Sequence, residues 1–160
     1  MGKGTEAARL DVIKNFPGLR YDNVFKITSP IDPNYNCIAW AYQIKGRWMW
    51  PPKGLPTGVL DAVTYWPNDN SSPDVERFVD AFRQKGYEKC DTSDFETGFR
   101  KIALYIKPGT TECTHAARQL SDGTWTSKLG CSYDIQHGTP QAIEGQCYGC
   151  VYCYMKKSFA

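Results

Sequence analysis

Hydrophobic residues recur at helical spacing in two segments of the chain. In the clearer segment the apolar residues follow the intervals of three and four that place side chains on one helix face. Ser72 is a favoured N-cap, Pro73 suits a first turn, and Gly86 is a common helix end. These signals predict a helix between 72 and 86, whose buried stripe comprises Val75, Phe78, Val79 and Phe82.

The second helical pattern starts at Asn36, another favoured N-cap, and is ended by Gly46. Its helical spacing is set by Cys37, Trp40, Ala41 and Ile44. Cys37 would therefore lie in the first turn of a helix. The same spacing is equally typical of a small apolar residue packed in a core.

The second half of the chain is typical of β-strands. Strands are predicted at 101–106, 114–120, 125–130 and 148–155, with an Asp122-Gly123 turn joining the second to the third. Helices come first and an antiparallel run of strands follows, which predicts an α+β fold. With 160 residues, the chain (1–160) is expected to form a single domain.

Charge and hydropathy exclude several classes of function. A net charge of +2, without a basic run, argues against nucleic acid as a partner. No segment approaches membrane-spanning length and the N-terminus lacks a secretory signal, so we expect a cytoplasmic protein without membrane association. Secretion by a signal-independent route stays open. Seven cysteines in a cytoplasmic chain are expected to be mostly reduced thiols.

Cys37 is the candidate nucleophile. A free thiol has a pKa of about 8.5, and a helix N-terminus or a nearby imidazole favours the reactive thiolate. The chain has two histidines, His115 and His137. His115 precedes the small residues Ala116 and Ala117 near the start of a strand, which leaves the backbone approachable, so we predict that it is the general base.

A third residue is needed to orient the base. We choose Asp134, because a carboxylate best holds an imidazolium. Ser127 is an alternative that depends on the hairpin: a two-residue turn would put Lys128 on the face of His115, whereas a bulge at Gly123 would put Ser127 there. His137 is the remaining alternative.

Two other features compete with catalysis. Cys147, Cys150 and Cys153 have the spacing C-x2-C-x2-C, and with Cys131 they make a candidate four-thiolate metal site, although the glycine turn of a metal knuckle is missing. Aromatic residues that could line a binding groove follow the cysteine helix: Trp48, Trp50, Tyr65 and Trp66.

Several motifs resemble a family of small bacterial proteins with no assigned activity, from about residue 36 to 156. They are NCIAWA at 36–41, WMWPP at 48–52, YWP at 65–67, GYEKC at 86–90, KIALY at 101–105, THAARQLSDGTWTSKLG at 114–130 and DIQH at 134–137. The order of elements is similar to the NlpC-type branch of the papain-like superfamily. That resemblance implies a cysteine-bearing helix packed on an antiparallel sheet of about four to six strands.

The same resemblance implies that Cys37 is the nucleophile and His115 the base, with a polar partner on or after the 125–130 strand. The chain departs from the branch in two places. Ile38 and Ala39 follow the cysteine where the branch usually has Ser-Gly, and Arg118 and Gln119 interrupt the small residues after the histidine.

These observations predict a cysteine hydrolase or transferase that acts on an amide bond of a peptide, a muropeptide or a glutamine side chain. A peptide or protein substrate is expected, and no metal or organic cofactor. The alternative is a non-catalytic binding module that keeps the fold and uses its Trp/Tyr-rich groove.

Overall fold

A computed structural model describes residues 6–29, 36–43, 48–49, 64–65, 74–129 and 133–158, the two short pieces by their backbone only. Three α-helices are α1 (Glu6–Asn15), α2 (Cys37–Tyr42) and α3 (Val75–Gln84). The described residues also form two 3₁₀ helices, η1 (Pro17–Tyr21) and η4 (Pro140–Ile143). Together with the sheets below, they confirm the α+β class. Within these residues, no helix is long and apolar enough to cross a membrane.

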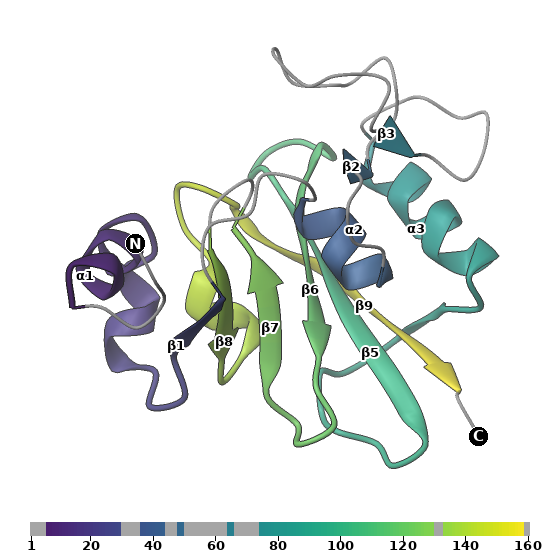
Figure 1. The fold of residues 1–160 in the computed structure, drawn as a ribbon. Helices are drawn as coiled ribbons and strands as arrows, with labels where there is room; N and C mark the ends of the chain where they lie inside the picture. Colours follow the sequence, from purple (N-terminus) through teal and green to yellow (C-terminus); the bar gives the residue numbers. More distant parts are fainter. Residues whose placement is uncertain are drawn as a thin grey trace.

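The main sheet has seven strands and is antiparallel throughout (Figure 1). In spatial order the strands are β1 (Lys26–Ser29), β8 (Asp134–His137), β7 (Trp125–Lys128), β6 (Cys113–Gln119), β5 (Phe99–Ile106), β9 (Cys150–Ser158) and β4 (Glu88–Cys90). A parallel pair lies apart, β2 (Trp48–Met49) with β3 (Thr64–Tyr65). The predicted four to six strands were too few, because the short strands β1, β4 and β8 add to those that the pattern marked.

Both predicted helices form, with shifted ends. The cap of α3 is Asp74, whose carboxylate accepts the N–H of Glu76 at 2.9 Å, so the prediction of Ser72 as cap was wrong. Asn36 caps α2 as predicted, accepting the N–H of Ala39 at 3.1 Å. That helix ends at Tyr42, four residues before Gly46, because Gln43 adopts a left-handed conformation with φ 69°.

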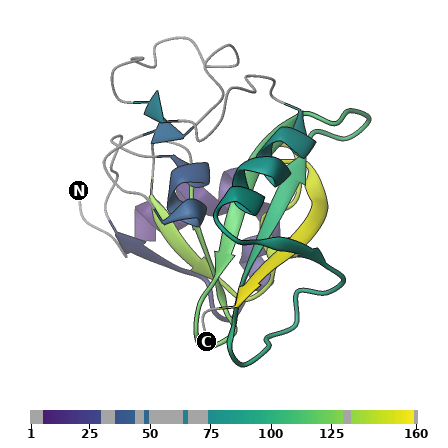
Figure 2. The same ribbon diagram turned by 90° about the vertical axis from the view of Figure 1, so that its right-hand side faces the viewer.

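The sheet separates two apolar cores (Figures 1 and 2). On one face, α2 and α3 pack over the central strands and bury Cys37, Phe78 and Ala116. On the other face, α1, η1 and η4 cover the sheet and bury Tyr105, Ala117 and other apolar side chains. Successive residues of a strand point to opposite faces. Once one residue of a strand is assigned to a core, the faces of the residues before and after it are therefore known.

The β6–β7 hairpin has the longer of the two turns weighed above. Leu120 pairs with Thr124 through a 2.7 Å backbone hydrogen bond, and Gly123 has φ 89°. Gln119 therefore lies opposite Trp125, and Arg118 opposite Thr126. With this register Ser127 lies on the same face as His115 and Ala117, and Lys128 lies on the face covered by α2.

Candidate functional site

The thiol of Cys37 is buried in the core between α2 and the sheet. Only 5% of the residue is exposed. Burial raises the pKa of the thiol to about 11, outweighing the backbone N–H groups of Ala116 and Ile38 and the charge of Lys128, which all lower it. The thiol is therefore protonated at neutral pH and behaves as a core residue.

His115 is fully buried on the opposite face. Its ring stacks on Tyr148 with centroids 3.9 Å apart and meets the edge of Tyr105 at 5.2 Å. Tyr105 belongs to the core beneath α1, η1 and η4. Ala116, the next residue in β6, enters the core beneath α2 together with Cys37.

The predicted pairing of Cys37 with His115 is therefore wrong. The thiol of Cys37 contacts the backbone of β6 from one side of the sheet. The imidazole of His115 projects from the same strand on the opposite side. The pKa shifts of the two groups have separate causes: burial and then His137 lower the pKa of His115, whereas burial raises the pKa of Cys37 against the lowering charge of Lys128.

Ser127 links the two histidines in a buried chain. The Oγ of Ser127 lies 3.0 Å from Nε2 of His115 and 2.8 Å from Nε2 of His137. Nδ1 of His137 lies 2.8 Å from the carbonyl oxygen of Thr139, so that nitrogen must carry the proton. Ser127 then donates to His137 and accepts from His115, which leaves Nδ1 of His115 as a lone pair without a hydrogen-bond partner.

Asp134 does not orient His115, so its prediction as third residue was also wrong. It lies opposite Lys128 across the β7–β8 ladder, on the face covered by α2. Its Oδ2 accepts the hydroxyl of Ser29 at 2.8 Å. Of the three candidates, Ser127 contacts His115 directly and His137 contacts it through the hydroxyl of Ser127. This series of hydrogen bonds does not include a thiol.

The described residues include no group of three or more His, Cys, Asp or Glu side chains that could hold a metal ion. Cys147 and Cys150 are exposed and Cys153 is partly buried, whereas Cys131 lies outside the described residues. The aromatic residues predicted to line a groove also fall outside them, apart from the backbone at Trp48 and Tyr65, so that groove stays a prediction.

A cleft that the sequence did not predict opens where β5 and β6 separate. β5 pairs with β9 from Phe99 onward but with β6 only from Ile102 onward. The resulting cavity has a volume of about 390 Å³, in the range of small-ligand sites. Its lining residues are Gln43, Phe95, Phe99, Arg100, Arg118, Gln119, Leu120 and Ser121.

Arg118 is the polar centre of this cleft, which we call the arginine cleft. Its guanidinium lies over the ring of Trp40 at 4.9 Å. The buried Nε has no hydrogen-bond partner, and within the described part of the chain Arg118 forms no salt bridge. Burial lowers the pKa of Arg118 and the charge of Arg100 lowers it further, whereas Tyr87 and the carboxylate of Asp134 raise it.

Arg100 enters the same cleft from β5. Its Nη1 donates to Oε1 of Gln43 at 3.2 Å. Gln43 is the residue with left-handed backbone that follows α2. Two lysines add to the local charge, because Lys157 lies opposite Arg100 and the pKa of Lys85 is lowered by burial and by both of these cations. The cleft therefore lies in a region of positive potential.

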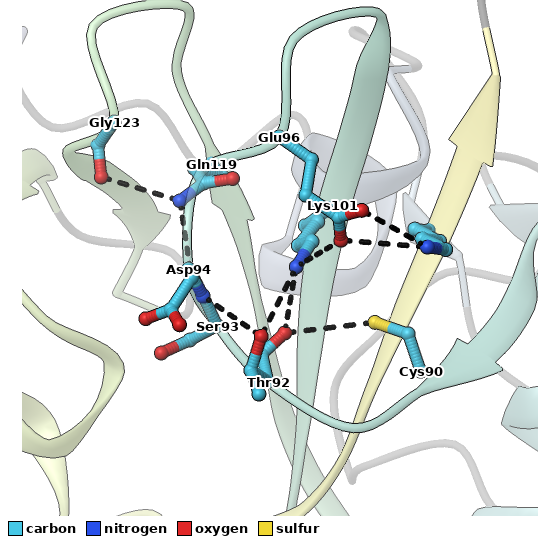
Figure 3. Close-up of polar contacts among 9 residues, drawn as sticks. Cys90, Thr92, Ser93, Asp94, Glu96, Lys101, Gln119 and Gly123 are labelled. Carbon is cyan, nitrogen blue, oxygen red and sulfur yellow. Dashed lines mark hydrogen bonds and ion pairs between the residues drawn. The ribbon is translucent and has the colours of Figure 1, made fainter.

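A network of polar contacts fixes the loop that carries Phe95 (Figure 3). The fully buried Lys101 donates to the carbonyl of Thr92 at 2.9 Å and pairs with Glu96 at 2.7 Å. Gln119 donates to the carbonyls of Ser93 and Gly123 at 3.0 and 3.3 Å. The loop is thus tied to β5 and β6 on either side of Phe95, which stays 48% exposed at the cleft.

One sequence signal could have indicated this cleft. Arg118 departs from the small residues that the NlpC-type branch places after its histidine. A cation in an otherwise apolar strand is costly to bury without a partner. Its distance from Arg100 could not be inferred, because it depends on where the β5–β6 ladder ends.

Comparison with known proteins identifies the family. Residues 26–156 match a domain of unknown function, DUF7689, and the chain belongs to that family. No curated protein and no solved structure matches the chain.

Proposed function

We propose that this member of the DUF7689 family is a non-catalytic binding module that recognises an oxyanion group, a carboxylate or a phosphate, in its arginine cleft. The observation that carries the proposal is the half-buried guanidinium of Arg118, whose Nε has no hydrogen-bond partner and which forms no salt bridge in the described part of the chain. Buried donors without acceptors are rare and cost about 1–3 kcal/mol. A ligand oxygen would supply the missing partner for this guanidinium.

The chemistry of the lining residues supports an anionic ligand with an apolar part. Guanidinium groups bind carboxylate and phosphate oxygens through paired N–H donors. Phe95 and Phe99 line the same cleft and offer apolar contact beside the charges. A peptide or protein that presents an acidic group next to an aromatic or aliphatic one has this chemistry.

The position of Cys37 supports a non-catalytic function. A nucleophilic thiol needs a base within hydrogen-bond reach and a lowered pKa. Cys37 has a pKa raised to about 11 by burial, and His115 points away from it. The proposal of a papain-like fold is supported by α2, which begins at the cysteine and packs on an antiparallel sheet, while the direction of His115 departs from that arrangement.

Amide chemical-shift mapping with benzoate and phenyl phosphate tests the binding function. We expect saturable shifts centred on the cleft residues, which disappear in Arg118→Gln. The control is Arg20→Gln, which removes the same charge from an exposed position and should bind like the wild type. If neither probe gives an Arg118-dependent shift, the proposed binding function is wrong.

The rival function is acyl transfer by Cys37. Mass-spectrometric identification of a covalent adduct on Cys37 after treatment with a peptide-aldehyde or acyl-ester probe at pH 7 would support it. The binding module predicts no adduct at Cys37 in the folded protein.

A further inference from the structure

We infer that the arginine cleft selects a group carrying two negative charges, and that Gln43 sets this selectivity by holding Arg100 beside Arg118. The inference rests on the proposed binding function and specifies its ligand class. Phosphate monoesters and dicarboxylates share this chemistry, and the experiment below distinguishes them.

The charge of the cleft favours a dianion. Arg100 and Arg118 line one cavity of about 390 Å³ from adjacent strands. They are close enough for the charge of Arg100 to lower the pKa of Arg118, against the opposite effects of Tyr87 and Asp134. One carboxylate neutralises one of two neighbouring guanidinium groups. A dianion neutralises both, so it relieves the repulsion between them as well as forming its own hydrogen bonds.

Lys85 and Lys157 increase the same preference. Lys157 lies opposite Arg100 on β9. Burial lowers the pKa of Lys85, and the charges of Lys157 and Arg100 lower it further. Lys85 is oriented by the ring of Tyr42, 4.3 Å from its Nζ, and it donates to the backbone carbonyl of Tyr42. Neither lysine forms a salt bridge with a described carboxylate, so their field is not neutralised locally.

Gln43 has an unusual backbone for its residue type. It is the one non-glycine residue with positive φ in the described part of the chain, at φ 69° and ψ 41°. Glycine is the usual residue at this position after a helix, because a Cβ makes the left-handed conformation unfavourable. Residues with such strain cluster at ligand-binding and other functional sites. The side chain of Gln43 accepts from Nη1 of Arg100 and lines the cleft.

Gln43 is therefore a positioning residue. Arg100 is exposed, and a long exposed side chain loses considerable entropy when it is held in one conformation. The acceptor on Gln43 restrains the guanidinium at the cleft before a ligand arrives. Because glutamine is neutral, its acceptor adds no negative charge to the cleft, whereas a glutamate in the same place would add one.

Four probes with one aromatic ring test the ligand class at pH 8: phenyl phosphate, phenyl sulfate, benzoate and phthalate. At that pH phenyl phosphate is a dianion, because the second pKa of a phosphate ester is near 6. Phenyl sulfate has a similar shape and one charge, so it is the matched control. We expect phenyl phosphate to bind at least about tenfold more tightly than phenyl sulfate and benzoate, the ratio that corresponds to one additional ionic contact of about 1.4 kcal/mol.

Phthalate distinguishes the two sources of a dianion. If phthalate binds as tightly as phenyl phosphate, the cleft accepts dicarboxylates as well as phosphate monoesters. If phthalate binds only as weakly as benzoate, the ligand class is a phosphate monoester. Equal affinities for phenyl phosphate, phenyl sulfate and benzoate would overturn the inference while leaving an oxyanion-binding module in place. Absence of Arg118-dependent binding by every probe would overturn the proposed function itself.

Variants of Gln43 test its role. Gln43→Gly removes the acceptor and relieves the backbone, so we expect a higher midpoint of thermal unfolding together with a phenyl phosphate affinity reduced about three- to tenfold. A merely structural residue would not change stability and affinity in opposite directions. An unchanged ratio of phenyl phosphate to phenyl sulfate affinity in Gln43→Gly would show that Gln43 does not set the selectivity.

Discussion

The thiol of Cys37 and the imidazole of His115 occupy opposite faces of the central sheet. Cys37 packs against Ala116 beneath α2, and His115 stacks on Tyr148 on the other side. A strand separates two groups that a cysteine hydrolase would need in contact. The polar groups on the face covered by α2 include Arg118 and Arg100, which line a cleft.

Alkylation of Cys37 should require high pH. Burial raises its pKa to about 11, whereas an ordinary cysteine has a pKa of about 8.5. Iodoacetamide labelling of the folded protein, followed by peptide mass spectrometry, should show the rate at Cys37 still rising above pH 9. The exposed Cys150 provides the internal reference. A rate at Cys37 that levels off below pH 7 would indicate an activated thiol.

Ser127→Ala should destabilise the fold strongly. The substitution removes the hydroxyl between two buried imidazoles, leaving two nitrogens without partners at a cost of about 1–3 kcal/mol each. Urea denaturation should therefore give a loss of about 2–5 kcal/mol in the free energy of unfolding. Thr97→Ala, which removes an exposed hydroxyl, should stay within about 0.5 kcal/mol of the wild type. Similar values for the two variants would contradict the buried chain.

Stability should fall as the pH drops from about 6.5 to about 4. Burial lowers the pKa of His137 to about 4 and that of His115 well below its usual value. Between the folded and unfolded pKa values the unfolded state binds more protons, so acid favours unfolding. For His137 the shift corresponds to about 3 kcal/mol. Urea titrations at several pH values should show this slope, and a flat profile over the same range would exclude neutral buried histidines.

Gln43→Gly should stabilise the protein. Relief of the left-handed backbone is worth about 1–2 kcal/mol, and the greater entropy of glycine in the unfolded chain removes part of it. We expect a net gain of about 0.5–1 kcal/mol in thermal or urea unfolding. The matched control is Gln84→Gly in the last turn of α3, where the backbone is α-helical, and this variant should lose stability. A loss in both variants would mean that Gln43 is not strained.

Local patterns predicted α2, α3 and four strands of the main sheet, but not α1 and not the faces of the strands. The stripe of α3 and the four predicted strands follow from periodicity, and the strand bounds differ from prediction by a few residues. Which face of β6 meets α2 depends on how the helix packs on the sheet, and that information is not local. The correct choice between Ser127 and Lys128 likewise depended on one residue in a turn, Gly123.

The short strands and the arginine cleft had weaker signals. β1, β4 and β8 have three or four residues each, too few for alternation to stand out. The cleft arises where two long strands diverge, so Arg100 and Arg118 come together through tertiary structure. Arg118 alone carried a local signal, as a cation among small residues.

The side chain of Arg118 provides the most direct test of the proposed function. Its Nε–H resonance, assigned by its absence in Arg118→Lys, can be followed by NMR during a titration with phenyl phosphate. Because this buried Nε has no acceptor in the protein, we predict a saturable shift of the resonance, with the same affinity as the cleft amides. A resonance that does not move at saturating phenyl phosphate would contradict recognition of the ligand by Arg118.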